Sequence, residues 1–251
     1  MKKVFSSKYQ PLESQIETLI KEFEYLGEKL DNGNRNTIKL FKVGEEIFNI
    51  KAFKKPNLLN RLIYRFFRSS KAQRSFEYAH HLLDNEILTP YPVAYFEDKK
   101  GLFFGKSYYV SRHLDYDLTY RELIKNSTYV GDEDLLSAFT KFTFDLHEKG
   151  IHFLDHSPGN TLIKFNDDQP NFYLVDLNRM NFGVLDFNTR MKNFARLSPI
   201  KEQVAIMAKT YAALIHREET EVFNVMWMYI STFQNKFQRK KRLKKRYKFW
   251  G

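Results

Sequence analysis

Apolar residues recur along the chain with two different spacings, and these spacings divide it into two regions. A helical pattern at residues 12–23 is followed by alternating or apolar runs that are typical of β-strands. The strand-like runs lie at residues 23–30, 37–42, 47–53, 93–96 and 102–111. A polar Asp-Asn-Gly-Asn-Arg-Asn turn separates the first two of them. The first half of the chain is therefore predicted to be rich in strands.

Helical spacing of apolar residues dominates the second half of the chain. Helical patterns lie at residues 58–67, 71–84, 135–149, 199–216 and 219–245. The third of these ends at Gly150 after a basic last turn, which is a common helix stop. A short hairpin is expected at residues 161–164 and 172–177. This order predicts an α+β fold with a strand-rich part followed by a helical part.

The positive charge of the chain is concentrated near its C-terminal end. The 251 residues include 41 Lys and Arg against 30 Asp and Glu, a net charge of +11. Nine of these cations are Lys236, Arg239, Lys240, Lys241, Arg242, Lys244, Lys245, Arg246 and Lys248. Without these nine, 32 basic residues remain against 30 acidic ones. We therefore expect residues 236–251 to form a polybasic tail that binds an anionic surface, although a solvated helix end could have the same composition.

Several classes of protein are excluded or disfavoured by composition. The chain contains no cysteine, which excludes a disulfide scaffold, a thiolate zinc site and a cysteine nucleophile. The uncharged run at residues 222–235 has 14 residues, fewer than the roughly 20 that a membrane-spanning helix needs. The basic N-terminus has no apolar signal core behind it. We expect a soluble protein that is made in the cytoplasm.

The stretch His-Phe-Leu-Asp-His-Ser-Pro-Gly-Asn at residues 152–160 carries the clearest chemical signal. Asp155 and Asn160 have the spacing of the Asp and Asn in the kinase catalytic loop H-R-D-x-x-x-x-N. Such an aspartate orients or accepts the proton of the acceptor hydroxyl, and the amide oxygen binds Mg²⁺. Asp176, at the end of an apolar strand, suits a second Mg²⁺ ligand because this ion prefers oxygen donors. Taken alone, Asp155 and Asn160 also fit a helix cap or a turn.

Lys51 and Glu77, which lie earlier in the chain, extend this interpretation. Lys51 interrupts an otherwise apolar strand, the position at which kinases keep the lysine that contacts the α- and β-phosphates. Glu77 lies in the middle of the expected helix at 71–84 and could pair with Lys51. Each has an ordinary explanation, because a lysine can snorkel from an edge strand and a helix glutamate is commonly solvated. Their order along the chain, ahead of the catalytic-loop residues, favours a kinase.

The sequence resembles the lipopolysaccharide kinases, which phosphorylate Kdo or heptose of the inner core. The resemblance covers roughly residues 30–200. It is carried by the turn at 35–36 and by residues 50–53, 68–79, 107–111, 155–160 and 175–180. It implies the use of ATP and Mg²⁺. It also implies that Gly33, Arg35 and Asn36 belong to the nucleotide-binding turn, although one glycine makes a weak phosphate loop.

The resemblance assigns a role to each matched residue. It makes Lys51 the phosphate-binding lysine and Glu77 its partner. It makes Asp155 the catalytic base, and it makes Asn160 and Asp176 the Mg²⁺ ligands.

The sequence departs from the family pattern at three places. Phe153 and Leu154 replace the His-Arg of H-R-D, so no arginine adjoins Asp155 in sequence to receive a phosphorylated activation loop. Asp-Leu-Asn replaces Asp-Phe-Gly, so a flipping phenylalanine is not expected. His156 stands where the family loop commonly has leucine. With His147 and His152 it has a spacing that could suggest a metal cluster, but His147 and His152 fall on different expected elements, so zinc is not favoured.

The fold class that follows is α+β, a protein-kinase-like fold of two lobes. We expect one such domain, with a strand-rich N-lobe at about 1–112, a helical C-lobe at about 113–235 and the polybasic tail at 236–251. The helical pattern at 58–67 has arginines opposite its apolar face. It is interpreted either as a helix packed on the core or as an interfacial helix that turns its arginines toward lipid.

The favoured function is ATP-dependent phosphorylation of Kdo or heptose on the lipopolysaccharide inner core. The partner would then be lipid A–core or a Kdo-containing precursor, and the tail would hold a peripheral enzyme on the inner face of the inner membrane. No nucleic-acid partner is expected. Two alternatives stay open: a kinase-like enzyme that acts on a protein or small-molecule acceptor, and a kinase-like binding module without catalysis.

Overall fold

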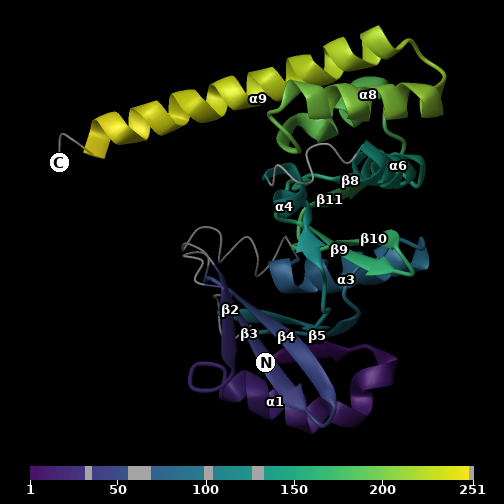
Figure 1. Cartoon of the computed structure of the whole chain (residues 1–251). Coiled ribbons are helices and arrows are strands. Elements are labelled where there is room, and N and C mark those ends of the chain that lie inside the picture. The colour runs from purple at the N-terminus through teal and green to yellow at the C-terminus, as the bar shows by residue number, and fades with distance from the viewer. Residues whose placement is uncertain (32–35, 56–68, 99–103, 126–132, 249–251) are drawn as a thin grey trace. The chain divides into compact units, whose positions relative to one another are not determined.

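The chain divides into two compact units (Figure 1). The computed structural model describes residues 1–31, 36–55, 69–98, 104–125 and 133–248. Unit 1 comprises Met1–Asp115 and Leu174–Asn178, and unit 2 comprises Tyr116–Tyr173 and Arg179–Gly251. Along the chain, unit 1 first gives way to unit 2 after Asp115.

Some of the expected features lie outside the described residues. These are Gly33 and Arg35 of the expected nucleotide-binding turn, the helical pattern at 58–67 and residues 249–251 of the polybasic tail. Asn36, the third residue of that turn, is described and begins a strand.

Among the described residues of unit 1, six strands form one antiparallel sheet in the order β1-β5-β6-β4-β3-β2. Their bounds are Lys2–Phe5 for β1, Glu28–Asp31 for β2, Asn36–Val43 for β3, Glu46–Phe53 for β4, Pro92–Glu97 for β5 and Ser107–Arg112 for β6. The short edge strand β1 was not expected, because four residues that begin with two lysines carry little periodic signal.

The strand predicted at residues 23–30 is wrong over most of its length. The chain turns at Glu22–Gly27, and strand structure begins only at Glu28. The reason is the side chain of Phe23, which is buried against the rings of Phe41 and Tyr108 at centroid distances of 6.0 and 5.3 Å. The turn that follows brings Gly27, with a φ of 87°, directly against the ring of Phe41, where a side chain would collide.

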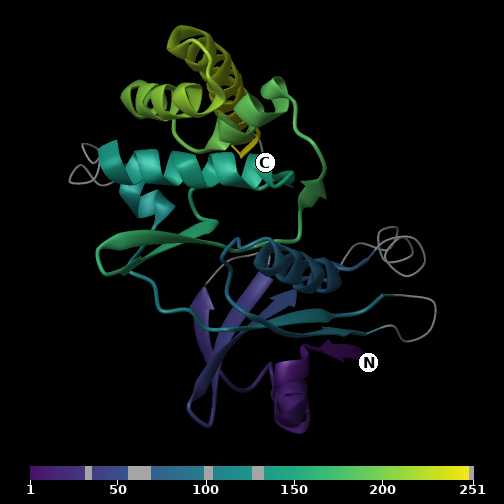
Figure 2. The same ribbon diagram turned by 90° about the vertical axis from the view of Figure 1, so that its right-hand side faces the viewer.

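Both faces of the unit 1 sheet are buried by helices (Figure 2). On one face, α1 (Glu13–Lys21) contributes to a cluster that contains Tyr9, Ile16, Ile20, Phe23, Phe41, Phe48, Ile50, Phe96, Tyr108 and Val110. On the other face, Ala72 and Phe76 of α3 (Lys71–Asp84) pack with Phe53 and Tyr95. Because side chains alternate along a strand, Lys51 of β4 lies on the same face as Phe53, the face that α3 covers.

Unit 2 combines short strands with helices. Its described elements are β7 (Leu118–Thr119), α4 (Tyr120–Lys125), α6 (Glu133–Glu148), β8 (Ile151–Phe153), β9 (Thr161–Asn166), β10 (Gln169–Leu174), β11 (Met180–Phe182), α7 (Phe187–Asn193), the 3-10 helix η2 (Phe194–Arg196), α8 (Lys201–Ile215) and α9 (Glu219–Lys248). Strands β10, β9 and β7 form one small sheet, and β11 pairs with β8. Residues of α4, α6, α7, η2, α8 and α9 share one apolar core.

Helix α9 is packed against unit 2 only over its first half. Val222, Met226 and Ile230 are fully buried, and the guanidinium group of Arg196 lies 5.4 Å from the centroid of the Phe233 ring. The described side chains from Asn235 onward are exposed. Figure 1 shows this part of the 30-residue helix, about 45 Å long in total, extending past α8. No helix in the described part of the chain combines the length and the apolar character needed to cross a membrane.

Candidate functional site

In unit 1, the lysine and the aspartate expected to serve the nucleotide form an ion pair. Lys51 Nζ donates to Asp176 Oδ1 over 2.8 Å, and the two residues are 125 positions apart in the sequence. The lysine side chain is only 13% exposed, and its ammonium group also lies 5.5 Å from the centroid of the Phe53 ring. The low exposure of the side chain and the nearby Phe53 ring therefore hold the Lys51 ammonium group next to Asp176.

The backbone at Asp176 adopts an uncommon conformation that its neighbours support. Its φ of 61° lies in the left-handed region, which few residues other than glycine, asparagine and aspartate occupy. Asn178 Nδ2 donates to the same Oδ1 atom over 2.6 Å. Because Oδ1 accepts from Lys51 and Asn178, Asp176 Oδ2 is left without a hydrogen bond from the described residues.

The segment that carries Asp176 is attached to α3 and to the loop that follows it. Arg74 of α3 is buried and donates from Nε to the carbonyl oxygen of Asn178 over 3.1 Å. Leu174 donates its backbone N–H to Leu88 O over 3.0 Å, and Thr89 Oγ1 donates to Leu174 O over 2.8 Å. Hydrogen bonds on both sides of Asp176 thus fix its position within unit 1.

Glu77 does not make the contact that was expected of it. Its side chain is exposed and accepts a hydrogen bond from Gln73 Nε2 over 2.7 Å, and it forms no ion pair with Lys51. The rotation of α3 is set by its buried residues Ala72 and Phe76, and this rotation turns Arg74 toward the Asp176 segment. The periodicity of the sequence located the helix correctly, but it could not tell which polar side chain would be turned inward.

In unit 2, Asp155 follows β8, and two other segments are bonded to the same short strand. β8 pairs with β11 so that Phe153 is opposite Met180, and Leu154 N donates to Arg179 O over 3.1 Å. Asn193, the last residue of α7, donates from Nδ2 to Phe153 O over 2.8 Å. The two residues before Asp155 thus bind the start of β11 and the end of α7.

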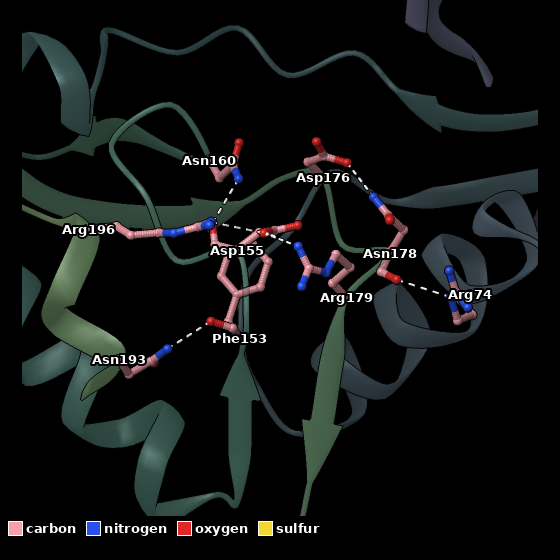
Figure 3. A network of polar contacts seen from close by, with 9 residues as sticks. All are labelled: Arg74, Phe153, Asp155, Asn160, Asp176, Asn178, Arg179, Asn193 and Arg196. Atoms are coloured by element: carbon pink, nitrogen blue, oxygen red, sulfur yellow. Dashed lines mark hydrogen bonds and ion pairs between the residues drawn. The ribbon is translucent and has the colours of Figure 1, made fainter. Parts of the chain in front are cut away.

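Two arginines that belong to none of the sequence motifs reach Asp155 from these segments (Figure 3). Arg179 Nη1 and Arg196 Nη1 donate to Asp155 Oδ1 over 3.0 and 3.1 Å. No described residue is bonded to Asp155 Oδ2. The sequence has no arginine directly before Asp155, and the structure brings two arginines to it from 24 and 41 positions further along the chain.

Asn160 is oriented by the loop that it closes. Its backbone N–H donates to Ser157 O over 2.9 Å, and its Nδ2 donates to the backbone oxygen of Asp155 over 2.8 Å (Figure 3). With the amide nitrogen held in this way, the Oδ1 atom of Asn160 has no hydrogen-bond partner among the described residues. Unit 2 therefore presents one amide oxygen and one carboxylate oxygen, those of Asn160 and Asp155, at the same loop.

The three histidines whose spacing could suggest a metal cluster belong to unit 2, and neighbouring side chains surround them. His147 bonds to Tyr211 Oη over 2.7 Å and to Asn193 Oδ1 over 3.0 Å, so both ring nitrogens are engaged, and burial lowers its pKa to about 4. His156 is buried against Phe139, and burial lowers its pKa to about 3. His152 is half-buried, which also lowers its pKa. Both fully buried rings are therefore neutral at physiological pH, as packed core residues would be.

The donor atoms fit a magnesium nucleotide. Mg²⁺ prefers hard oxygen ligands and commonly keeps few protein ligands besides water and phosphate. Asp176 Oδ2 in unit 1 and Asn160 Oδ1 in unit 2 are oxygens of this kind, and Lys51 supplies a cation for phosphate. Unit 1 thus carries residues suited to phosphate and metal, and unit 2 by itself carries an amide oxygen of the kind that binds metal and the candidate base.

Comparison of the sequence finds no matching family model and no matching curated protein. Among solved structures, 941 chains match the fold, and a fold shared this widely does not by itself identify an activity. One of them, described as WaaP in complex with acyl carrier protein, is similar over 95% of this chain and 99% of its own, with a TM-score of 0.65 and 14% sequence identity. The predicted fold class is confirmed: the protein has a mixed α/β, kinase-like fold with a strand-rich N-terminal part and a helical C-terminal part.

Proposed function

We propose that the protein is an ATP-dependent phosphotransferase that phosphorylates a sugar, Kdo or heptose, of the lipopolysaccharide inner core. The observation that carries the proposal is the Lys51–Asp176 ion pair. It joins two residues, 125 positions apart, that the motif order had assigned to the same nucleotide. The kinase-like fold and its likeness to WaaP, a lipopolysaccharide-core heptose kinase, support the acceptor class.

Each residue of the proposed enzyme has a defined task. Phosphoryl transfer depends mainly on positioning and on stabilising charge. Lys51 would bind a phosphate oxygen of the nucleotide in place of Asp176 Oδ1. Bound with the nucleotide, Mg²⁺ would neutralise charge on the β- and γ-phosphates, and Asp176 and Asn160 would hold it. Asp155 would accept a hydrogen bond from the acceptor hydroxyl through its Oδ2 atom, which no described residue binds. It would take up the hydroxyl proton as the hydroxyl oxygen bonds to the γ-phosphorus of ATP and the bond from that phosphorus to the departing ADP breaks.

The exposed C-terminal part of α9 is suited to binding an anionic membrane surface. From residue 236 onward its described side chains lie in solvent, and this segment carries nine cations and no anion. Like charges spaced three or four residues apart destabilise a helix, and an anionic surface removes that repulsion. Each cation near an anionic bilayer contributes roughly 1 kcal/mol to binding. We place the enzyme on the inner face of the inner membrane, where its lipid-linked acceptor is made.

The test is mass spectrometry of lipid A–core from cells without the gene and from the same cells complemented with wild type, Lys51→Met or Lys42→Met. Lys42 is an exposed lysine of the neighbouring strand β3 and serves as the matched control. We expect wild type and Lys42→Met to restore one phosphate on the inner core and Lys51→Met to fail. An unchanged core in every strain would refute the acceptor. ATP turnover by the purified protein on a different acceptor would then favour a kinase-like enzyme of another specificity.

A further inference from the structure

Two guanidinium groups share a single carboxylate oxygen at Asp155. The other ion-paired arginines of the described unit 2 differ, because Arg190 pairs with Glu148 and Arg217 with Glu221, one cation for one anion. At Asp155 two positive charges meet one negative charge. The local charge is therefore positive before any ligand binds.

The two arginines have unused hydrogen-bonding capacity. A guanidinium group has five N–H donors in a planar fork, and Arg179 and Arg196 each use one Nη1 atom on Asp155. Their side chains are 53% and 40% exposed, so the remaining donors are open to solvent, whereas Asp155 is 18% exposed. Such forks recognise carboxylates and phosphates through paired, charge-assisted hydrogen bonds.

Their positions are set by the fold. Arg179 is held next to β8 through its own carbonyl oxygen, which accepts from Leu154 N. Arg196 is the last residue of η2, which follows α7 directly in the chain. Asn193 at the end of α7 is hydrogen-bonded to Phe153 O, and the guanidinium group of Arg196 lies over the Phe233 ring of α9. Two cations held from different segments are preorganised, which lowers the cost of ordering them around a ligand.

We infer that Arg179 and Arg196 bind an oxyanion, a carboxylate or a phosphate, that the acceptor sugar carries close to the hydroxyl it presents to Asp155. The inference rests on the proposed function and deepens it. Because both guanidinium groups bind Oδ1 of the residue whose Oδ2 is free for the hydroxyl, the anion and the hydroxyl belong to one sugar unit. The preferred acceptor is therefore an acidic sugar such as Kdo, or a sugar that is already phosphorylated, and an uncharged heptose is a poorer one.

The experiment measures kcat and KM of the full-length protein with a soluble Kdo-containing fragment and with the methyl ester of the same fragment, which lacks the negative charge. The variants are Arg179→Gln and Arg196→Gln. The matched control is Arg217→Gln, since Arg217 also pairs with one carboxylate and lies over an aromatic ring, that of Phe187 at 4.2 Å.

We expect the wild type to prefer the acid to the ester. Each site variant should raise KM for the acid about 10- to 100-fold, the range for losing a hydrogen bond to a charged group, with little change for the ester. The control should match the wild type. Equal losses of kcat on both acceptors would overturn the inference and assign the arginines to positioning Asp155. A selective rise in KM for ATP would overturn it too, and would assign them to the γ-phosphate.

A binding measurement separates this inference from the proposed function. Calorimetry without nucleotide should show that the wild type binds the acid fragment more tightly than the ester, and that the variants at Arg179 and Arg196 lose this difference. If the wild type phosphorylates neither fragment, the proposed function fails for Kdo as the acceptor, and the binding result alone decides whether the anion site exists. Equal affinity of the wild type for acid and ester would refute it.

Discussion

Replacement of His156 by leucine should remove part of the acid sensitivity of the protein. The His156 ring is 1% exposed and packs between Phe139 and Phe153, at centroid distances of 5.5 and 5.8 Å. Thr143 Oγ1 donates its single hydrogen to Phe139 O over 3.0 Å, so His156 Nε2 must be the donor in its 3.2 Å bond with that hydroxyl. Nδ1 is then an acceptor that has no partner among the described residues.

The size of the effect follows from linkage between protonation and folding. Burial lowers the pKa of His156 to about 3 in the folded protein, whereas an exposed histidine has a pKa of about 6.5. The unfolded chain therefore takes up a proton near pH 6.5 that the folded chain refuses. The neutral, buried ring makes its full contribution to the free energy of unfolding above pH 6.5. This contribution decreases as the pH falls from 6.5 toward 3. At pH 5.5, one unit below 6.5, protonation of the unfolded chain at His156 lowers the free energy of unfolding of the wild type by about 1.4 kcal/mol. The leucine variant does not show this decrease.

Urea unfolding at pH 8 and at pH 5.5 measures this quantity. Trp227 of α9 belongs to unit 2, so its fluorescence follows the unit that contains His156. Changes in packing alter the stability of His156→Leu equally at both pH values and cancel in the comparison. His147, whose pKa burial lowers to about 4, contributes the same slope to both proteins. Parallel losses of stability in wild type and variant between pH 8 and pH 5.5 would refute the reasoning.

Three further predictions concern catalysis and the tail. Asp155→Asn should slow phosphoryl transfer by about 10²–10⁴-fold, the usual contribution of a general base, and leave ATP affinity in calorimetry unchanged; loss of both would indicate a structural role. Asp176→Ala should abolish turnover and the Mg²⁺ dependence of nucleotide binding with an unchanged circular dichroism spectrum, and near-normal transfer would contradict its assignment. Truncation after Asn235 should weaken binding to anionic vesicles, most clearly at low salt, and lower activity on membrane-embedded acceptor but not on a soluble fragment. Equal binding of the full-length chain to neutral and anionic vesicles would argue against the membrane role.

Local sequence patterns were sufficient to predict the long helices and to predict which face of β4 carries Lys51. The helix predicted at residues 71–84 coincides with α3, which begins after Ser70 because that side chain accepts a hydrogen bond from Gln73 N over 3.0 Å. The helix predicted at 219–245 is α9, three residues longer. Because side chains alternate along β4, Lys51 lies on the face of the sheet that α1 does not cover. These features depend on the repeat of the backbone and on capping, which neighbouring residues determine.

The partners of the functional side chains were decided only by the tertiary structure. The sequence suggested Glu77 as the partner of Lys51 and identified no partner for Asp155. In the structure Lys51 pairs with Asp176, and Arg179 and Arg196 bind Asp155. The partners of Asp155 depend on which residue of β11 is opposite Phe153 and on where α7 ends. The exposure of Glu77 depends on how α3 is rotated about its own axis. Strand register and helix rotation are set by the packing of many distant apolar residues at once, so the spacing of residues along the chain does not contain them.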